Sequence, residues 1–125
     1  MEKDASMVKV LIVDDDEDLL EMVTLMLRAS RMQVKSLNAG ALLLETLKTE
    51  TPDILLMDIF LGDCDGRQLC KQLKNSVAYT GFPVFLYSAG EITNASIVES
   101  DADYFLRKPF EMSHLVTRIH ESIKK

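Results

Sequence analysis

The chain has 125 residues, 47% of them hydrophobic, and a net charge of −6. This length fits one domain with a single core, and the negative charge argues against direct binding to nucleic acid or to anionic membranes, which require a basic surface. No apolar run approaches the ~20 residues of a membrane span, and the polar residues 1–7 lack the core of a signal peptide. We therefore expect a soluble cytoplasmic protein, with a flexible leader over residues 1–7 and one folded domain over residues 8–125.

Along the chain, short apolar runs alternate with stretches of helical spacing. Buried strands are predicted at residues 8–13, 54–58, 83–87 and 102–106, with a weaker edge strand at 33–37. Helices are predicted at residues 16–28, 39–48, 66–74, 91–100 and 112–124. Asn38 is expected to cap the second helix, and poor helix formers after Gly90 are expected to weaken the fourth. Five alternations predict an α/β fold, a doubly wound parallel sheet with helices on both faces.

Polar side chains follow four of the five predicted strands at the point where each strand ends. Asp14 and Asp15 follow the first strand, Asp58 closes the third, Ser88 follows the fourth and Lys108 comes shortly after the fifth. Taken singly, each has an ordinary explanation, such as a solvated helix start or a strand end. Because the carboxyl ends of parallel strands meet at one edge, where α/β proteins place their chemistry, the joint placement predicts one functional site.

The residue types at this edge suit phosphoryl transfer to a carboxylate. Two carboxylates ~4 Å apart cost on the order of 4 kcal/mol at an effective dielectric constant near 20, so the acids call for a cation. A site with few protein oxygens, in which water completes the coordination shell, fits Mg²⁺ best. Asp58 is the candidate nucleophile, Lys108 can meet phosphoryl oxygens as a point charge, and Ser88 can donate a hydrogen bond. These residues predict a Mg²⁺-assisted phosphoryl acceptor.

Five stretches, in this order and spacing, resemble the receiver (response regulator) domain of two-component signalling. They are residues 10–16, 52–58, 65–66, 83–89 and 104–110, and the similarity runs from about residue 8 to residue 123. The resemblance implies a flavodoxin-like (βα)5 fold with strand order 2-1-3-4-5. It also makes residues 8–125 a receiver domain.

The resemblance implies a role for each acid and for the lysine. Asp58 corresponds to the phosphoacceptor, and Lys108 to the lysine that contacts the phosphoryl group. Asp14, Asp15 and Asp58, with the backbone carbonyl of Phe60, correspond to the Mg²⁺ ligands. The expected cofactor is therefore Mg²⁺.

The resemblance also implies a switch. Ser88 corresponds to the switch hydroxyl, and Phe105 to an aromatic side chain that rotates, although a plain core aromatic is an equal alternative. The bond between Lys108 and Pro109 is expected to be cis. The family usually has proline where Gly62 stands, so a looser loop after Asp58 is expected. The stretch from Ser88 to Phe105 is shorter than usual, which puts in doubt the output face that this helix usually helps to form.

The function implied is a two-component phosphorelay. A sensor histidine kinase or a phosphotransfer protein would donate the phosphoryl group, and phosphorylation of Asp58 would switch a surface for a protein partner that the sequence does not name. Direct binding of nucleic acid or membrane is not expected. The chain would not be an enzyme beyond its own phosphorylation and dephosphorylation. Two alternatives remain: a degenerate receiver that acts only as an interaction module, and a small Mg²⁺-dependent phosphatase, although Phe60 replaces the second acid of haloacid-type phosphatases.

Overall fold

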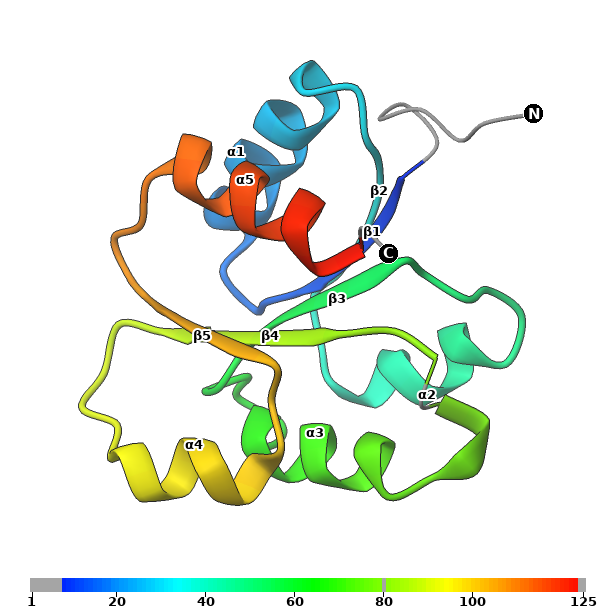
Figure 1. Cartoon of the computed structure of the whole chain (residues 1–125), viewed down its shortest axis with the longest axis vertical. Coiled ribbons are helices and arrows are strands. Elements are labelled where there is room, and N and C mark those ends of the chain that lie inside the picture. Colours follow the sequence, from blue (N-terminus) through cyan, green and yellow to red (C-terminus); the bar gives the residue numbers. More distant parts are fainter. Residues whose placement is uncertain (1–7, 80, 124–125) are drawn as a thin grey trace.

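Strands and helices alternate along the part of the chain that the computed structural model describes, residues 8–79 and 81–123 (Figure 1). The expected leader over residues 1–7 and the last two residues of the predicted domain lie outside the described residues. The elements are β1 (Lys9–Val13), α1 (Glu17–Ala29), β2 (Gln33–Leu37), α2 (Ala41–Leu47), β3 (Ile54–Asp58), α3 (Gly66–Lys74), the 3-10 helix η2 (Val77–Tyr79), β4 (Val84–Ser88), α4 (Asn94–Ser100), β5 (Tyr104–Arg107) and α5 (Met112–Ile123).

The five strands form one parallel sheet in the order β2-β1-β3-β4-β5, which confirms the predicted fold. All five residues of β3 and of β4 are buried, as expected for parallel strands covered on both faces. The register pairs Val13 with Met57, Asp58 with Tyr87, and Ser88 with Arg107. The strand ends that carry the polar side chains therefore lie side by side.

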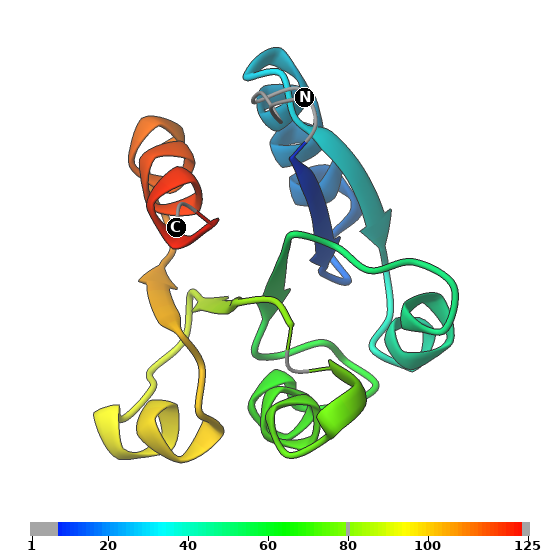
Figure 2. The ribbon, with the colours of Figure 1, turned by 45° about the vertical axis from the view of Figure 1, so that its right-hand side comes forward.

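Helices cover both faces of the sheet (Figures 1 and 2). On one face α1 and α5 pack on strand residues such as Val10 and Ile12, and on the other α2 and α3 pack on the alternate residues Leu11 and Val13. Each face thus has its own apolar cluster. Among the described residues, no helix has both the length and the hydropathy needed to cross a bilayer.

The start of α2 differs from the prediction. Asn38 does not cap it; its side-chain amide donates to Glu17 Oε2 at 2.9 Å. The carboxylate of Asp63 instead accepts the backbone N–H groups of Gly40 and Ala41, at 3.0 and 2.9 Å, and α2 begins at Ala41. The start of α2 is therefore capped by a carboxylate distant in sequence and not by the neighbouring Asn38.

The fourth helix is short. It begins at Asn94, three residues later than predicted, because Thr93 caps it by accepting the N–H of Ser96 at 3.2 Å. Of its seven residues only Ser100 is buried. The poor helix formers at the start of the predicted helix therefore form a loop and the cap instead of the first helical turn.

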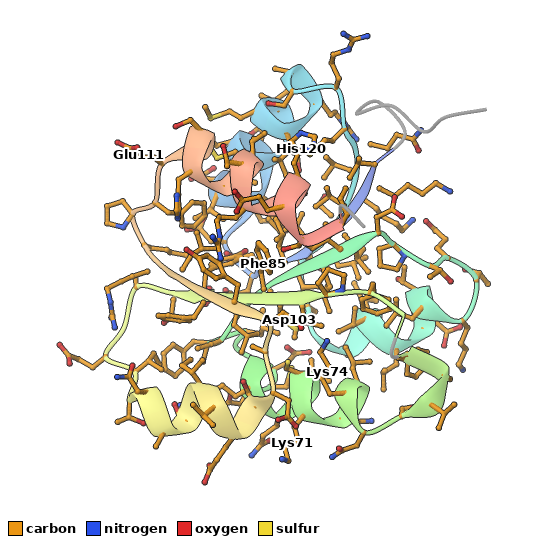
Figure 3. The ribbon with its side chains drawn as sticks, in the orientation of Figure 1. Lys71, Lys74, Phe85, Asp103, Glu111 and His120 are labelled. Atoms are coloured by element: carbon orange, nitrogen blue, oxygen red, sulfur yellow. The ribbon has the colours of Figure 1, made fainter. Side chains whose placement is uncertain are left out.

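An ion pair closes the end of the sheet opposite the polar strand ends. Lys74 Nζ lies 2.6 Å from Asp103 Oδ2, and the same oxygen accepts the N–H of Val84 at 2.7 Å. Figure 3 shows Lys74 and Asp103 next to each other, away from the helices α1 and α5. This contact fixes α3 to the starts of β4 and β5. It therefore lies at the edge of the sheet opposite the polar strand ends.

Candidate functional site

Three carboxylates meet at the carboxyl edge of the sheet. Asp14 and Asp15 follow β1 directly, and Asp58 ends β3. Each offers one oxygen atom that lies within 4.8 Å of the others. Asp14 and Asp58 are buried and Asp15 is exposed, so solvent reaches the cluster from one side. Such oxygen ligands with room for water fit Mg²⁺, and the sequence predicted these three acids as its ligands.

Both oxygens of Asp14 are engaged. Oδ1 accepts the backbone N–H of Asp16 at 2.9 Å. Oδ2 accepts the hydroxyl of Tyr87 at 2.9 Å and lies 3.4 Å from Lys108 Nζ. Asp14 itself has no exposed surface, so these donors replace water around its charge.

Lys108 joins two of the carboxylates. Its Nζ lies 3.3 Å from Asp58 Oδ2 and 3.4 Å from Asp14 Oδ2, and its side chain is only 17% exposed. The Lys108–Pro109 bond is cis, as expected. Three carboxylates against one ammonium group leave two negative charges in the cluster, and a divalent cation would balance them.

The electrostatic cost falls on Asp58. Burial raises its pKa above the ordinary value, and the neighbouring charge of Asp14 adds to the rise. Lys108 and the N–H of Phe60 act in the opposite direction without cancelling it. The ionised form that a nucleophile needs is therefore expensive at this position until more positive charge arrives.

The loop after β3 holds Phe60 against this cluster. Phe60 forms a short antiparallel bridge with Asp65, closed on one side by a hydrogen bond from the N–H of Gly66 to the carbonyl of Ile59 at 2.6 Å. The N–H of Phe60 donates to Asp58 Oδ1 at 3.2 Å. Its backbone therefore lies beside the acids, and its carbonyl stays a predicted metal ligand.

Gly62, which stands where the family usually has proline, has a left-handed backbone conformation. Its φ is +84°, and a Cβ atom there would lie 3.0 Å from Asp15 Oδ2. Only glycine adopts that backbone region readily and leaves room for the carboxylate. The N–H of Leu61 also bonds to the carbonyl of Cys64 at 3.2 Å, so hydrogen bonds hold this loop in place.

The two predicted switch residues lie in different surroundings. Ser88 is fully buried, and its Oγ accepts the N–H of Gly90 at 3.0 Å. The ring of Phe60 covers Gly90, since a Cβ atom there would lie 3.0 Å from the ring. Phe105 is half-buried on β5, with the guanidinium of Arg107 5.6 Å from its ring centroid. Both predicted roles of Phe105 remain compatible with that position.

Sequence reasoning missed Tyr87. It lies inside an apolar strand directly before Ser88, and its hydroxyl reaches Asp14 across the sheet. Burial and the charge of Asp14 raise the pKa of this phenol well above its ordinary value, so the hydroxyl remains a donor. The available signal was a hydroxyl group in a strand of buried side chains, which requires a partner.

Comparison with known proteins agrees with this geometry. A family model described as the response regulator receiver domain matches residues 10–120. The DNA-binding response regulator MtrA of Mycobacterium tuberculosis is 30% identical over 119 residues, which are 94% of this chain and 51% of MtrA. The alkaline phosphatase synthesis transcriptional regulatory protein PhoP of Bacillus subtilis is 29% identical over 119 residues, 94% of this chain and 49% of PhoP.

A solved structure gives the same result. A crystal structure from Chloroflexus aurantiacus, assigned as a response regulator, superposes with a TM-score of 0.87 at 31% identity. The match covers 94% of this chain and 98% of that chain. The whole fold described here, with its five-stranded sheet, is thus a known arrangement.

These relatives correct one expectation from the sequence. The prediction that direct nucleic acid binding is absent is wrong as an inference from charge, because MtrA is a DNA-binding response regulator. The chain spans about half the length of the curated relatives that it matches. The net charge of these 125 residues therefore does not decide whether a relative of about twice the length binds DNA.

Proposed function

The chain belongs to the response regulator receiver domain family, and on that premise we propose that Asp58 accepts a phosphoryl group in a Mg²⁺-dependent reaction. One observation carries this proposal: a buried carboxylate at a strand end lies among two further acids and an ammonium group. The excess negative charge there favours binding of a cation, and that cation together with Lys108 would offset the charge of a phosphoryl group.

Asp14, Asp15 and Asp58, with the carbonyl of Phe60, would hold the Mg²⁺ ion. When bound, Mg²⁺ would supply positive charge that offsets the negative charge of the carboxylates and of an incoming phosphoryl group. Asp14 is already fixed by its hydrogen bonds and Asp15 is exposed, so one ligand is rigid and another can adjust.

Asp58 supplies the attacking oxygen and receives the phosphorus, while the leaving group departs with the electron pair of its bond to phosphorus. Lys108, already 3.3 Å from Asp58 Oδ2, then pairs with a phosphoryl oxygen. The hydroxyl hydrogen of Ser88 is not used in the bond from Gly90, because Ser88 Oγ is the acceptor there, so it can turn to another phosphoryl oxygen.

Phosphorylation would act as a switch. The phosphoryl group carries roughly 1.5–2 negative charges, in place of the single charge that the Asp58 carboxylate loses, and its oxygens draw Ser88 and Lys108 inward. We propose that the segment after β4 follows Ser88 and that Phe105 takes the space left behind. The affinity for a partner can change only to the extent that the partner binds the two states with different affinities.

The donor in this proposal is a sensor histidine kinase or a phosphotransfer protein, and the chain catalyses only its own phosphorylation and dephosphorylation in the cytoplasm. The complete set of acids and lysine argues against a degenerate module. Phe60, which offers no acid two residues after Asp58, argues against a haloacid-type phosphatase. The downstream partner that recognises the phosphorylated state is proposed to be a protein.

The test is phosphorylation by acetyl phosphate with Mg²⁺, followed by intact mass measurement. We expect one phosphate per chain, lost in Asp58→Ala and when Mg²⁺ is chelated. Asp53→Ala is the matched control, because Asp53 stands at the opposite end of the same strand, where it binds the N–H of Lys9. Phosphate on Asp58→Ala would refute the assignment, and repeated hydrolysis of an external phosphate ester, without phosphate accumulating on the chain, would favour a phosphatase.

A further inference from the structure

We propose that Tyr87 is a positioning residue of the Mg²⁺ site, whose hydroxyl holds the carboxylate of Asp14 in the orientation that binds the ion. This inference rests on the function proposed above. The resemblance gave Tyr87 no role, and the side chain comes from β4 rather than from a strand that supplies an acid.

The contacts of Asp14 show why one hydroxyl matters. Oδ1 is fixed by the turn after β1, through the N–H of Asp16. Oδ2 has two donors, the hydroxyl of Tyr87 at 2.9 Å and Lys108 at the longer distance of 3.4 Å. The Asp16 N–H on one oxygen and the Tyr87 hydroxyl on the other fix the plane of the Asp14 carboxylate. The lone pair that remains free for a metal ion therefore has a defined direction.

Phosphorylation makes the two donors on Oδ2 unequal. Lys108 also lies 3.3 Å from Asp58, and in the proposed reaction it moves to a phosphoryl oxygen. Tyr87 is then the side-chain donor that stays on Asp14. Its ring is packed by Phe110 at a centroid distance of 5.6 Å, so the hydroxyl cannot follow the lysine.

The ring and the hydroxyl can be separated experimentally. Lys108 Nζ lies 5.1 Å from the ring centroid of Tyr87, and Phe110 meets the same ring. Tyr87→Phe keeps both ring contacts and removes only the bond to Asp14. The control is Tyr104→Phe, which removes a hydroxyl that lies 3.0 Å from His114 Nε2, away from the acids.

Mg²⁺ affinity of the unphosphorylated protein, measured by calorimetry, is the main readout. We expect Tyr87→Phe to bind Mg²⁺ roughly tenfold more weakly, the lower end of the effect seen when the partner of a metal ligand is removed. Tyr104→Phe should match the wild type within twofold. With acetyl phosphate, the Mg²⁺ concentration for half-maximal rate should rise by the same factor, while the rate at saturating Mg²⁺ stays within about threefold.

A purely structural role gives a different pattern. In that case Tyr87→Phe melts at a lower temperature but binds Mg²⁺ as the wild type does, and the inference is overturned. Tighter Mg²⁺ binding by the variant would also overturn it, since the hydroxyl would then compete with the ion. If the wild type binds no Mg²⁺ at all, the proposed function falls together with this inference, whereas normal wild-type binding with an unaffected variant removes the inference alone.

A measurement on the wild type covers the case in which the variant does not fold. In an NMR titration the ring signals of Tyr87 should shift with Mg²⁺ at the midpoint found by calorimetry, and those of Tyr104 should not. If the ring signals of Tyr87 do not shift on addition of Mg²⁺, the proposed link between its hydroxyl and the metal site is wrong.

Discussion

Helices α3 and α4 lie next to each other on the same face of the sheet, yet they are held by different forces (Figures 1 and 2). α3 buries Gly66, Cys70 and Leu73, and its first residue lies against the backbone of Asp58. α4 buries only Ser100, and Val98 on it is 74% exposed. The proposed phosphorylation site is therefore supported by close packing on one side and bordered by a weakly buried helix on the other.

Polar contacts attach α4 to its neighbour. Arg67 on α3 donates to Ser96 Oγ at 3.2 Å and pairs with Asp65, at 2.7 Å to Oδ2. Its guanidinium also lies 5.7 Å from the ring centroid of Phe60. Little apolar burial means that α4 can open locally for less free energy than α3, which suits the movement proposed for the segment after β4.

The largest effect should come from filling the close contact on the α3 side. A Cβ atom at Gly66 would collide with the carbonyl oxygen of Asp58, whereas one at Gly81 would meet nothing within 4 Å. We expect Gly66→Ala to lower the free energy of unfolding by about 2–3 kcal/mol, a usual cost of overpacking, and Gly81→Ala to leave it nearly unchanged. Urea denaturation of both variants gives the comparison, and equal midpoints would mean that α3 is not tightly packed there.

Asp58 should show an intermediate effect of the opposite sign. Its pKa is raised in the folded state, so between the unfolded and the folded pKa the folded state binds more protons, and the contribution of Asp58 to stability falls as pH rises. Without Mg²⁺ at neutral pH, Asp58→Asn should therefore be more stable than the wild type, by on the order of 1 kcal/mol.

The pH dependence sharpens this second prediction. The advantage of Asp58→Asn should appear as pH rises above ~4, the range in which a free aspartate ionises, and added Mg²⁺ should shrink it. Asp63 and Asp65 behave in the opposite way: hydrogen bonds from Ala41 and from Arg67 lower their pKa values, and their stabilising contribution is lost as pH falls. Thermal melting of the two proteins across pH, with and without Mg²⁺, separates these effects. A less stable variant at neutral pH would show that Lys108 outweighs burial.

The smallest effect should be confined to α4. Arg67→Ala removes the bond to Ser96, so amide hydrogen exchange in residues 94–100 should become roughly two- to fivefold faster, as expected for a hydrogen bond worth about 0.5–1 kcal/mol. Arg118→Ala is the control, because Arg118 pairs with Glu121 and lies 4.2 Å from the ring centroid of Tyr104, away from α4. Faster exchange across the whole chain would instead indicate a global loss of stability.

The sequence predicted the sheet, its strand ends and the three acids because these depend on local patterns. Apolar runs mark buried strands, and parallel topology then brings their ends together without any knowledge of side-chain contacts. The bounds of β3 were predicted to the residue, since its burial is complete on both faces.

Contacts between distant residues could not be read in the same way. The cap of α2 comes from Asp63, more than twenty residues away, while Asn38 looked like the local candidate and binds Glu17 instead. The bond from Tyr87 to Asp14 joins residues 73 positions apart. Such pairings need the strand register, which periodicity does not give. The inference about nucleic acid failed for another reason, because the net charge of one domain does not decide what the regulators related to it bind.

The contact between Tyr87 and Asp14 also has an optical consequence. The chain contains three tyrosines and no tryptophan, so its near-ultraviolet absorption and emission come chiefly from phenol rings. One of these rings is hydrogen-bonded to a carboxylate of the acidic cluster and has an ammonium group nearby. The protein therefore carries an intrinsic chromophore inside the cluster, and unlabelled protein can report spectroscopically on what enters it.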